Sequence, residues 1–221
     1  MKRIFRKILD FLFPDSCILC ELELNQCEEF ICSSCYVLLN PFEPDIYESH
    51  KKFLGKINIK DISAMYIYSK DSYVQNIMHS IKYKGNSKLA VILGEEYASK
   101  NTLKGIDLIT PVPLHSKRFR KRGYNQSMEW AKGISDKSGI LALEVLKRTK
   151  ETKTQTKQSR FERWKNVEDS FSIMEPDQIK GKTILLVDDV ITTGSTIEAC
   201  ANELIKHGAR EVKVAAIGIA Y

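Results

Sequence analysis

Apolar positions in the later part of the chain follow two spacings, one typical of strands and one typical of helices. Short apolar runs predict strands at residues 62–68, 106–113, 143–148, 182–188 and 211–220. Helical spacing predicts helices at residues 72–83, 87–100, 124–139 and 195–209. Strands that alternate with helices indicate an α/β fold, in which a parallel sheet carries helices on both faces.

Residues 1–60 lack this alternation and are irregular. Their first apolar residues fall on one helical face and predict a short amphipathic helix: Ile4, Phe5, Ile8, Leu9 and Leu12. We expect it to dock on its own protein rather than on a membrane. Charged residues interrupt the run, and no stretch approaches the ~20 apolar residues of a membrane span. We therefore expect a cytoplasmic protein of two parts, residues 1–60 and 61–221.

The charge is unevenly distributed between these parts. The chain has 34 Lys and Arg against 28 Asp and Glu, a net charge of +6. Residues 1–60 carry 8 basic and 9 acidic side chains, and residues 61–221 carry the other 26 and 19, a net of +7. Positive charge on the larger part suits a polyanionic partner or a phosphate-rich ligand. A solvated basic surface explains the charge equally well.

Four of the six cysteines form two C-x₂-C pairs that are separated by eleven residues. Two such pairs can present four thiolates to a tetrahedral Zn²⁺ at about 2.3 Å per sulfur. We predict a zinc ribbon with a structural Zn²⁺ whose ligands are Cys17, Cys20, Cys32 and Cys35, because so small a segment buries little core. Disulfides are the alternative, which a cytoplasmic location disfavours. Cys27 is interpreted as a spare thiol and Cys200 as a buried small residue.

The stretch LLVDDVITTGST, residues 185–196, joins an apolar strand to a helix through two acids and a hydroxyl-rich turn. Asp188 and Asp189 come at the carboxyl end of the strand, where ligands bind in open α/β sheets. Gly194 permits a close backbone approach, and hydroxyls with free N–H groups at a helix start suit a phosphate. No Walker-type lysine is present, which argues against a nucleoside triphosphate loop. We infer a sugar-phosphate site; a purely structural strand-turn-helix is the alternative.

This order of residues resembles the phosphoribosyl pyrophosphate (PRPP) motif of type I phosphoribosyltransferases. Further segments are similar to the ComF family of competence-associated proteins: IKYKG (81–85), PVPLHSKRFRKRGYNQS (111–127) and the series Thr152, Gln155, Arg163, Asn166 and Phe171. Members of that family pair an N-terminal zinc ribbon with a phosphoribosyltransferase-like domain. Tyr124 stands where the family more often has Phe, and Lys157 and Gln158 replace small and apolar residues. The resemblance covers essentially the whole chain.

The resemblance implies a type I phosphoribosyltransferase-like sheet and roles for single residues. Asp188 and Asp189 would be the catalytic pair. PRPP, with Mg²⁺, would be held by this pair and by Val190, Thr192, Thr193, Gly194, Ser195 and Thr196. The loop that follows the second strand would bind pyrophosphate through Pro113, Leu114, Lys117, Arg118 and Arg122. A solvated basic loop is the alternative there, and His115 is interpreted as a loop histidine without a catalytic role.

A second basic segment, residues 147–165, has eight cations and two acids, a net of +6 in nineteen residues. By resemblance it would be the flexible catalytic loop of these transferases. It also suits single-stranded nucleic acid, with Phe161 and Trp164 as stacking platforms, although Trp164 is as well explained by packing. The nucleic-acid candidates are Arg120, Lys121, Lys153, Arg160, Arg163 and Trp164.

Two functions fit these features. The ComF resemblance implies a PRPP-binding protein that supports DNA uptake and the handling of single-stranded DNA in natural transformation, with a competence helicase and recombination proteins as partners. The alternative is an active phosphoribosyltransferase of nucleotide metabolism that transfers the sugar from PRPP to a nitrogen acceptor. A sensor that binds PRPP without turnover would share the same site. No sequence feature identifies an acceptor.

Overall fold

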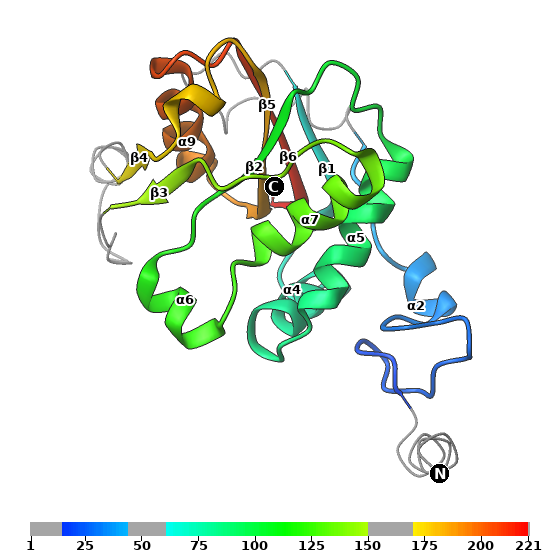
Figure 1. The fold of residues 1–221 in the computed structure, drawn as a ribbon. Coiled ribbons are helices and arrows are strands. Elements are labelled where there is room, and N and C mark those ends of the chain that lie inside the picture. Colours follow the sequence, from blue (N-terminus) through cyan, green and yellow to red (C-terminus); the bar gives the residue numbers. More distant parts are fainter. Residues whose placement is uncertain (1–14, 44–60, 150–169, 221) are drawn as a thin grey trace, which may run out of the picture.

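A four-stranded parallel sheet forms the centre of the molecule (Figure 1). The computed structural model describes residues 15–43, 61–149 and 170–220. The strands lie in the order β1 (Ile62–Tyr68), β6 (Glu211–Ala220), β5 (Thr183–Ile191) and β2 (Leu108–Pro111). Every neighbouring pair in this order is parallel, which confirms the predicted α/β class. The predicted helix at residues 1–12 lies outside the described residues.

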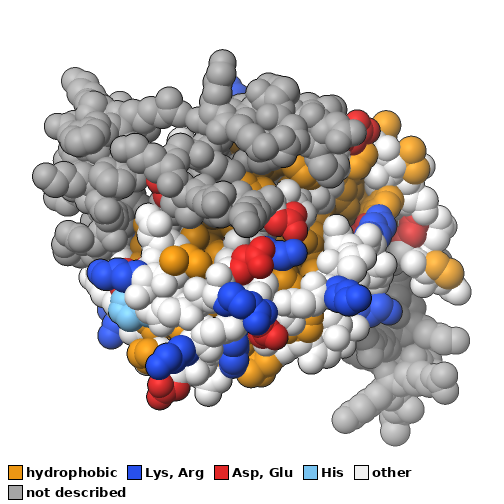
Figure 2. Space-filling view, turned by 90° about the horizontal axis from the view of Figure 1, so that it is seen from above, with side chains coloured by type: hydrophobic (Ala, Val, Ile, Leu, Met, Phe, Trp, Pro, Cys, Tyr) orange, Lys and Arg blue, Asp and Glu red, His pale blue; other side chains and the backbone are white. Residues whose placement is uncertain are grey.

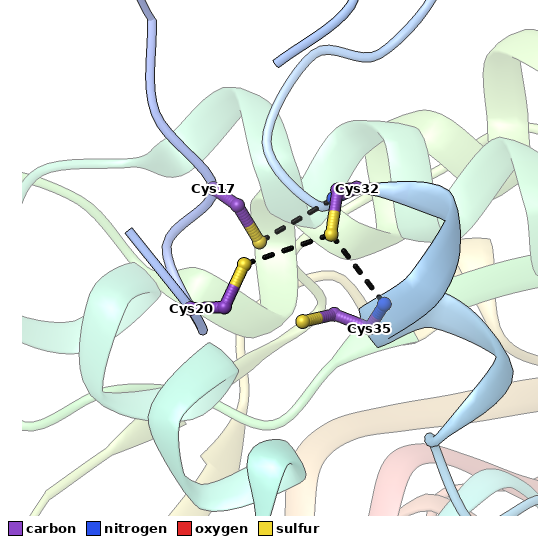
Figure 3. Close-up of side chains that lie close together, drawn as sticks. All are labelled: Cys17, Cys20, Cys32 and Cys35. Carbon is purple, nitrogen blue, oxygen red and sulfur yellow. Dashed lines mark hydrogen bonds between the residues drawn. The ribbon is translucent and has the colours of Figure 1, made fainter. Parts of the chain in front are cut away.

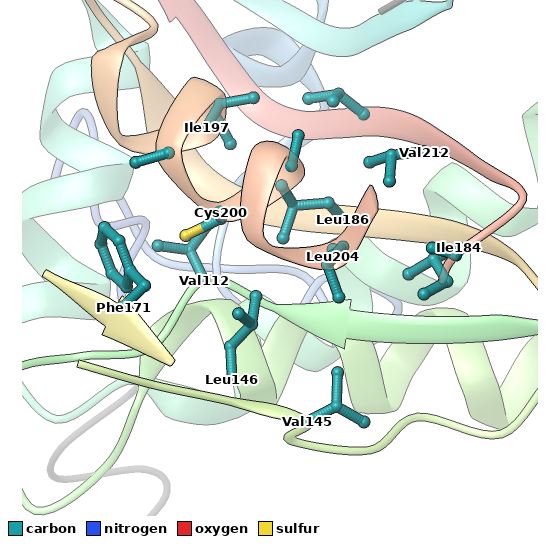
Figure 4. Packing of buried hydrophobic residues seen from close by; sticks show 14 of the residues in the cluster. Val112, Val145, Leu146, Phe171, Ile184, Leu186, Ile197, Cys200, Leu204 and Val212 are labelled. Atoms are coloured by element: carbon teal, nitrogen blue, oxygen red, sulfur yellow. The ribbon is translucent and has the colours of Figure 1, made fainter. Parts of the chain in front are cut away.

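Helices cover both faces of the sheet, as the alternating pattern predicts. Along β5, Ile184 and Leu186 belong to one apolar cluster and Leu185 and Val187 to the other, because successive side chains of a strand point to opposite faces. One face carries α9 (Ser195–Lys206), and Figure 4 shows its side chains packed over β5. The other face carries α4 (Tyr73–Tyr83), α5 (Ser87–Lys100) and α7 (Gln126–Ser138).

Helices α5 and α7 cross at a pair of glycines. A Cβ atom on Gly133 would lie 1.9 Å from the carbonyl oxygen of Val91, and one on Gly94 would lie 2.3 Å from that of Trp130. Both neighbours are backbone atoms, so neither can turn aside. Trp130 is fully buried beside this crossing and meets Tyr97 edge-on, with ring centroids 5.2 Å apart. The crossing fixes α7, whose first turn faces the end of β5.

The strand predicted at 143–148 leaves the parallel sheet. The chain makes a parallel bridge between Ile109 and Ala142, and then β3 (Leu146–Arg148) pairs antiparallel with β4 (Phe171–Ile173). Leu146 and Phe171 bury their side chains in the cluster beneath α9, which anchors this two-stranded sheet to the core. Strand β4 was not predicted from the sequence. The short helix η2 (Pro176–Gln178) follows it.

The N-terminal part rests on the edge of the sheet at β1. The backbone N–H of Phe42 donates to Met65 O, and that of Ile67 donates to Asn40 O, both at 3.0 Å. Leu39 is buried in the main core. The short helix α2 (Ser33–Val37) lies beside α5 (Figure 1), and the Tyr36 hydroxyl bonds Glu96 of α5. The boundary between residues 60 and 61 stays a prediction. None of the described helices is long and apolar enough to cross a membrane.

Candidate functional site

A cavity of about 710 Å³, here called the main cavity, opens beyond the carboxyl ends of β2 and β5. Strand β2 ends at Pro111 opposite Val187, whereas β5 continues to Ile191 along β6 alone. Asp188 and Asp189 therefore lie inside β5 and not in a loop. The strand continues for three residues beyond its predicted end at residue 188. Because β2 has already ended, the edge of β5 at these acids is open to the main cavity.

Each of the two carboxylates is held by a different helix. The Ser127 hydroxyl of α7 donates to Asp188 Oδ1 at 3.0 Å, and the backbone N–H of Asp189 donates to the same oxygen at 2.8 Å. Lys82 Nζ of α4 lies 2.8 Å from Asp189 Oδ2, while the N–H of Val190 donates to Asp189 Oδ1 at 2.7 Å. Three elements thus meet at the acid pair.

The environment disfavours the ionised form of Asp188. Burial, followed by the negative charge of Asp189, raises the pKa of Asp188 to about 7. The hydrogen bonds from the Asp189 N–H and from Ser127, and the charge of Lys82, oppose this change but do not cancel it. The two acids consequently differ: Asp189 has a cation beside it, whereas the raised pKa of Asp188 lies near neutral pH.

The turn after β5 supplies backbone and hydroxyl groups beside the acids. Gly194 caps α9 with a φ of 76°, a conformation that a side chain disfavours. Thr192 and Thr196 line the main cavity together with Val190. Thr193 and Ser195 lie in the same turn with their hydroxyls 3.2 Å apart, but they and Gly194 are not part of the cavity wall. Thr192 and Thr196 therefore bring two hydroxyl groups of this turn to the cavity that the acids line, and hydroxyls at a helix start suit a phosphate.

Five cations also line the main cavity: Lys82, Arg118, Lys121, Arg122 and Arg148. With the two acids, they leave a formal excess of three positive charges. The guanidinium of Arg122 bonds Gln126 and lies 5.6 Å from the ring centroid of Tyr83. Burial, and then the charge of Arg118, lowers the pKa of Arg148. Such a wall suits a ligand with several negative charges.

The basic stretch after β2 is helical rather than a loop. Helix α6 (Ser116–Arg122) begins where the Lys117 N–H donates to His115 Nδ1 at 3.2 Å, and it ends at Gly123, whose φ is 86°. Pro113, Leu114, Arg118 and Arg122 line the main cavity, as does Lys121, whereas Lys117 does not. Arg120 lines a neighbouring cavity. Four candidates lie outside the described residues: Lys153, Arg160, Arg163 and Trp164.

Sequence reasoning gave no role to Lys82 or Ser127, which the fold brings to the main cavity, and it counted Arg148 only among the cations of the segment 147–165. Lys82 and Ser127 stand in segments that carried the family resemblance, IKYKG and PVPLHSKRFRKRGYNQS. Neither periodicity nor spacing links α4 or α7 to the end of β5. Only the resemblance offered a signal for them.

The four predicted metal ligands come together outside the main cavity (Figure 3). The sulfur atoms of Cys17, Cys20, Cys32 and Cys35 all lie within 4.8 Å of one another. None of the six cysteines forms a disulfide in the described chain, and Cys27 is exposed outside this group. Four sulfur donors at this separation fit a structural metal ion with no open position.

The environment of Cys17 favours its thiolate form. Burial by itself raises the pKa of Cys17, but backbone N–H groups, foremost that of Cys32 at 3.4 Å, outweigh it and lower the pKa to about 6. Burial and the neighbouring sulfurs raise the pKa of Cys35. Thiolates packed together repel each other, so a cation at their centre would relieve the repulsion.

Comparisons with known proteins agree with this architecture. Residues 125–217 match the family model described as a phosphoribosyl transferase domain. Competence protein F of Haemophilus influenzae is 38% identical over 114 residues, 51% of this chain and 50% of that protein. The chain is ComF-like. The DNA utilization protein YhgH of Escherichia coli (strain K12) is 32% identical over 152 residues, 62% of this ComF-like chain and 63% of that protein.

The matches therefore span half to just under two thirds of the length of these relatives. Among solved structures, the glutamine PRPP amidotransferase from B. subtilis is 22% identical, with a TM-score of 0.46, over 64% of this chain and 30% of that one. A likeness of this degree supports no argument about the site.

Proposed function

We propose that this ComF-like chain binds PRPP with Mg²⁺ in the main cavity and supports DNA uptake and the handling of single-stranded DNA in natural transformation. The observation that carries the proposal is the acid pair of β5, which lies between a phosphate-type turn and five cations. A ribose needs hydrogen-bond acceptors, and its phosphates need donors and positive charge. Both sets line one cavity here.

Each part of PRPP has a matching group in the main cavity. Asp188 and Asp189 accept hydrogen bonds from the two ribose hydroxyls. The turn at residues 192–196, of which Thr192 and Thr196 line the cavity, receives the 5′-phosphate. Arg118, Lys121 and Arg122 contact the diphosphate, whose charge offsets the formal excess in the wall. The acid pair and the cavity also fit Mg²⁺, which, when bound with PRPP, would neutralise the diphosphate.

The DNA role rests on the names of two relatives, a competence protein and a DNA utilization protein. On this proposal the protein acts in the cytoplasm with a competence helicase and recombination proteins. Residues 1–60 hold a structural Zn²⁺ through Cys17, Cys20, Cys32 and Cys35, and residues 61–221 form the PRPP-binding domain. The basic α6 and the segment 147–165 contribute contacts to single-stranded DNA.

Calorimetry tests the ligand. Wild-type protein should bind PRPP in the presence of Mg²⁺, and Asp188→Asn with Asp189→Asn should weaken binding at least about tenfold, since two hydrogen bonds to charged acceptors are lost. Asp136→Asn, an exposed acid of α7, is the matched control. Inorganic diphosphate should bind both proteins, because it lacks the ribose that the two acids contact. Equal affinity of wild type and double variant for PRPP would refute the site.

An active phosphoribosyltransferase remains the second candidate. It is favoured by one observation, the placement of Asp188 and Asp189 side by side in the wall of the main cavity, because two carboxylates there would stabilise positive charge that develops on a ribose. The test adds nucleobases, one at a time, to protein with PRPP and Mg²⁺ and measures the release of diphosphate. Base-dependent release that the double variant lacks would establish transfer. Binding without release would leave a PRPP-binding protein.

A further inference from the structure

A second cavity of about 380 Å³, here called the side cavity, shares part of its wall with the main cavity. The shared residues are Pro113, Leu114, Asn125 and Arg148. The rest of its wall comes from α6 and from the segment that leads into and out of the β3–β4 pair. The sugar-phosphate assignment does not use this second space.

Helix α6 presents a different face to each cavity. Arg118, Lys121 and Arg122 line the main cavity, whereas Ser116, Phe119 and Arg120 line the side cavity. Each trio has the spacing i, i+3 and i+4, which places its members on one side of a helix. No residue of α6 is buried, and Figure 1 shows the helix standing away from the sheet. Four of the five cations of α6 are thus divided between the two cavities, three in the main cavity and one in the side cavity.

The positive charge of α6 is only partly compensated by acids among the described residues. The helix contains no acid, and Lys117 and Arg118 each precede another cation by four residues, an arrangement that destabilises a helix. Arg120 and Lys121 have no acidic partner among the described residues, and neither has Lys147 of β3. A short helix without a buried residue gains stability from an anion that binds it.

The side cavity combines this charge with an open aromatic ring. Phe119 is 48% exposed and Met174 42% exposed, so both leave apolar surface in the wall. Arg120 and Lys147 stand in the same wall, together with the exposed carboxylate of Glu144. A free phosphate would contact the cations but not the aromatic ring. An apolar peptide would contact the ring but not the cations. A nucleotide unit uses both, since its base stacks and its phosphate needs cations.

We propose that the side cavity binds one nucleotide unit of a single-stranded nucleic acid. The base stacks on Phe119, the adjoining phosphates contact Arg120 and Lys147, and the Glu144 carboxylate accepts a hydrogen bond from a base amino group while repelling the phosphates. This inference rests on the proposed DNA function, and it assigns the strand a site separate from that of PRPP. The two ligands bind opposite faces of α6.

The test measures fluorescence anisotropy of a labelled, mixed-sequence single-stranded oligodeoxynucleotide with the full chain at low salt. Phe119→Ala should weaken binding about 5- to 100-fold, the range for loss of one stacked base, and Phe119→Tyr should stay near wild type. Leu141→Ala, at a 57% exposed apolar residue outside the wall, is the control. Arg120→Gln should reduce the salt slope by about one, as for one lost phosphate contact.

Two further measurements separate the possible failures. PRPP binding by Phe119→Ala should equal wild type, and a variant that loses both ligands would count against separate sites. If wild type and Phe119→Ala bind the oligonucleotide equally, the stacking site is refuted and the DNA function stands. If wild type does not bind it at low salt, direct DNA contact by this chain is refuted, and the side cavity with it.

Discussion

At the scale of single residues, the repulsion between the two adjacent carboxylates of β5 is reduced differently at each acid. Asp189 is 5% exposed and has Lys82 Nζ 2.8 Å away. Asp188 has hydrogen-bond donors but no cation within ion-pair distance among the described residues, and its pKa rises to about 7. Asp189 is therefore paired with a cation in the absence of a ligand. Asp188 gains its charge most readily when a ligand or cation is bound.

This difference predicts how stability depends on pH. The pKa of Asp188 in the folded protein, about 7, exceeds the ~3.9 of an exposed Asp, so the folded state favours the protonated form. That contribution is complete below about pH 4 and is lost as the pH rises through about 7. Asp188→Asn cannot ionise, and it should gain about 2–4 kcal/mol relative to wild type between about pH 4 and pH 8.

Urea unfolding of both proteins across that pH range measures the effect. Asp136→Asn removes an exposed carboxylate from α7 and should follow wild type at every pH. Parallel stability curves for wild type and Asp188→Asn would contradict the assigned burial of charge. Added PRPP with Mg²⁺ should reduce the gap at high pH, because it stabilises only the protein with its carboxylate intact.

At the scale of elements, apolar spacing predicted the strands and helices that build the core. The bounds of β1, β6 and α5 agree with the prediction, because long apolar patterns leave little choice. Helix α6 was not predicted, because it has no apolar face and depends on caps at His115 and Gly123. Strand β4 was not predicted, because three residues are too few to show an alternation of apolar and polar positions. Lys82 and Ser127 reach the acids only through tertiary packing, and the spacing of residues along the sequence does not predict such contacts.

The crossing of α5 and α7 gives an element-scale prediction. Gly133→Ala places a methyl group 1.9 Å from the Val91 carbonyl oxygen, and only separation of the two helices can relieve the clash. We expect a loss of about 2–4 kcal/mol in the free energy of unfolding, measured from the urea midpoint. Weaker PRPP binding should accompany it, because α7 carries Ser127 to Asp188.

Gly105→Ala is the matched control for that change. Gly105 has a φ of 82° but open space around its missing Cβ, so its substitution should cost only about 1 kcal/mol of backbone strain. Equal losses for the two variants would show that the close approach of α5 and α7 is not what constrains Gly133.

At the scale of the whole molecule, net charge says less than its placement. Figure 2, seen from above, shows lysine and arginine side chains mixed with acidic ones over the visible face. The net charge of +6 therefore does not by itself mark an interface. The five cations that line the main cavity, and Arg120 in the wall of the side cavity, are better evidence for a binding surface. The C-x₂-C spacing predicted the cysteine cluster, but it gave no indication of where the cluster docks.

That docking ties the cysteine cluster to the stability of the sheet. Ile18, Leu19, Phe30 and Ile31 of the cysteine-bearing part pack against the cluster beneath α4, α5 and α7. Residues 40–42 bond to the outer edge of β1. Loss of the metal should therefore loosen more than the cysteine loops, since repelling thiolates would pull these residues from the core.

Cys17→Ser tests this coupling, with Cys27→Ser as the matched control at an exposed thiol outside the cluster. We expect wild type and Cys27→Ser to hold about one zinc per chain and Cys17→Ser to lose it. Thermal unfolding of Cys17→Ser should begin at lower temperature, and hydrogen exchange should quicken at the amides of Phe42 and Ile67, which pair the two parts. Unchanged exchange at Ile67 in a zinc-free variant would mean that the sheet edge is independent of the metal site.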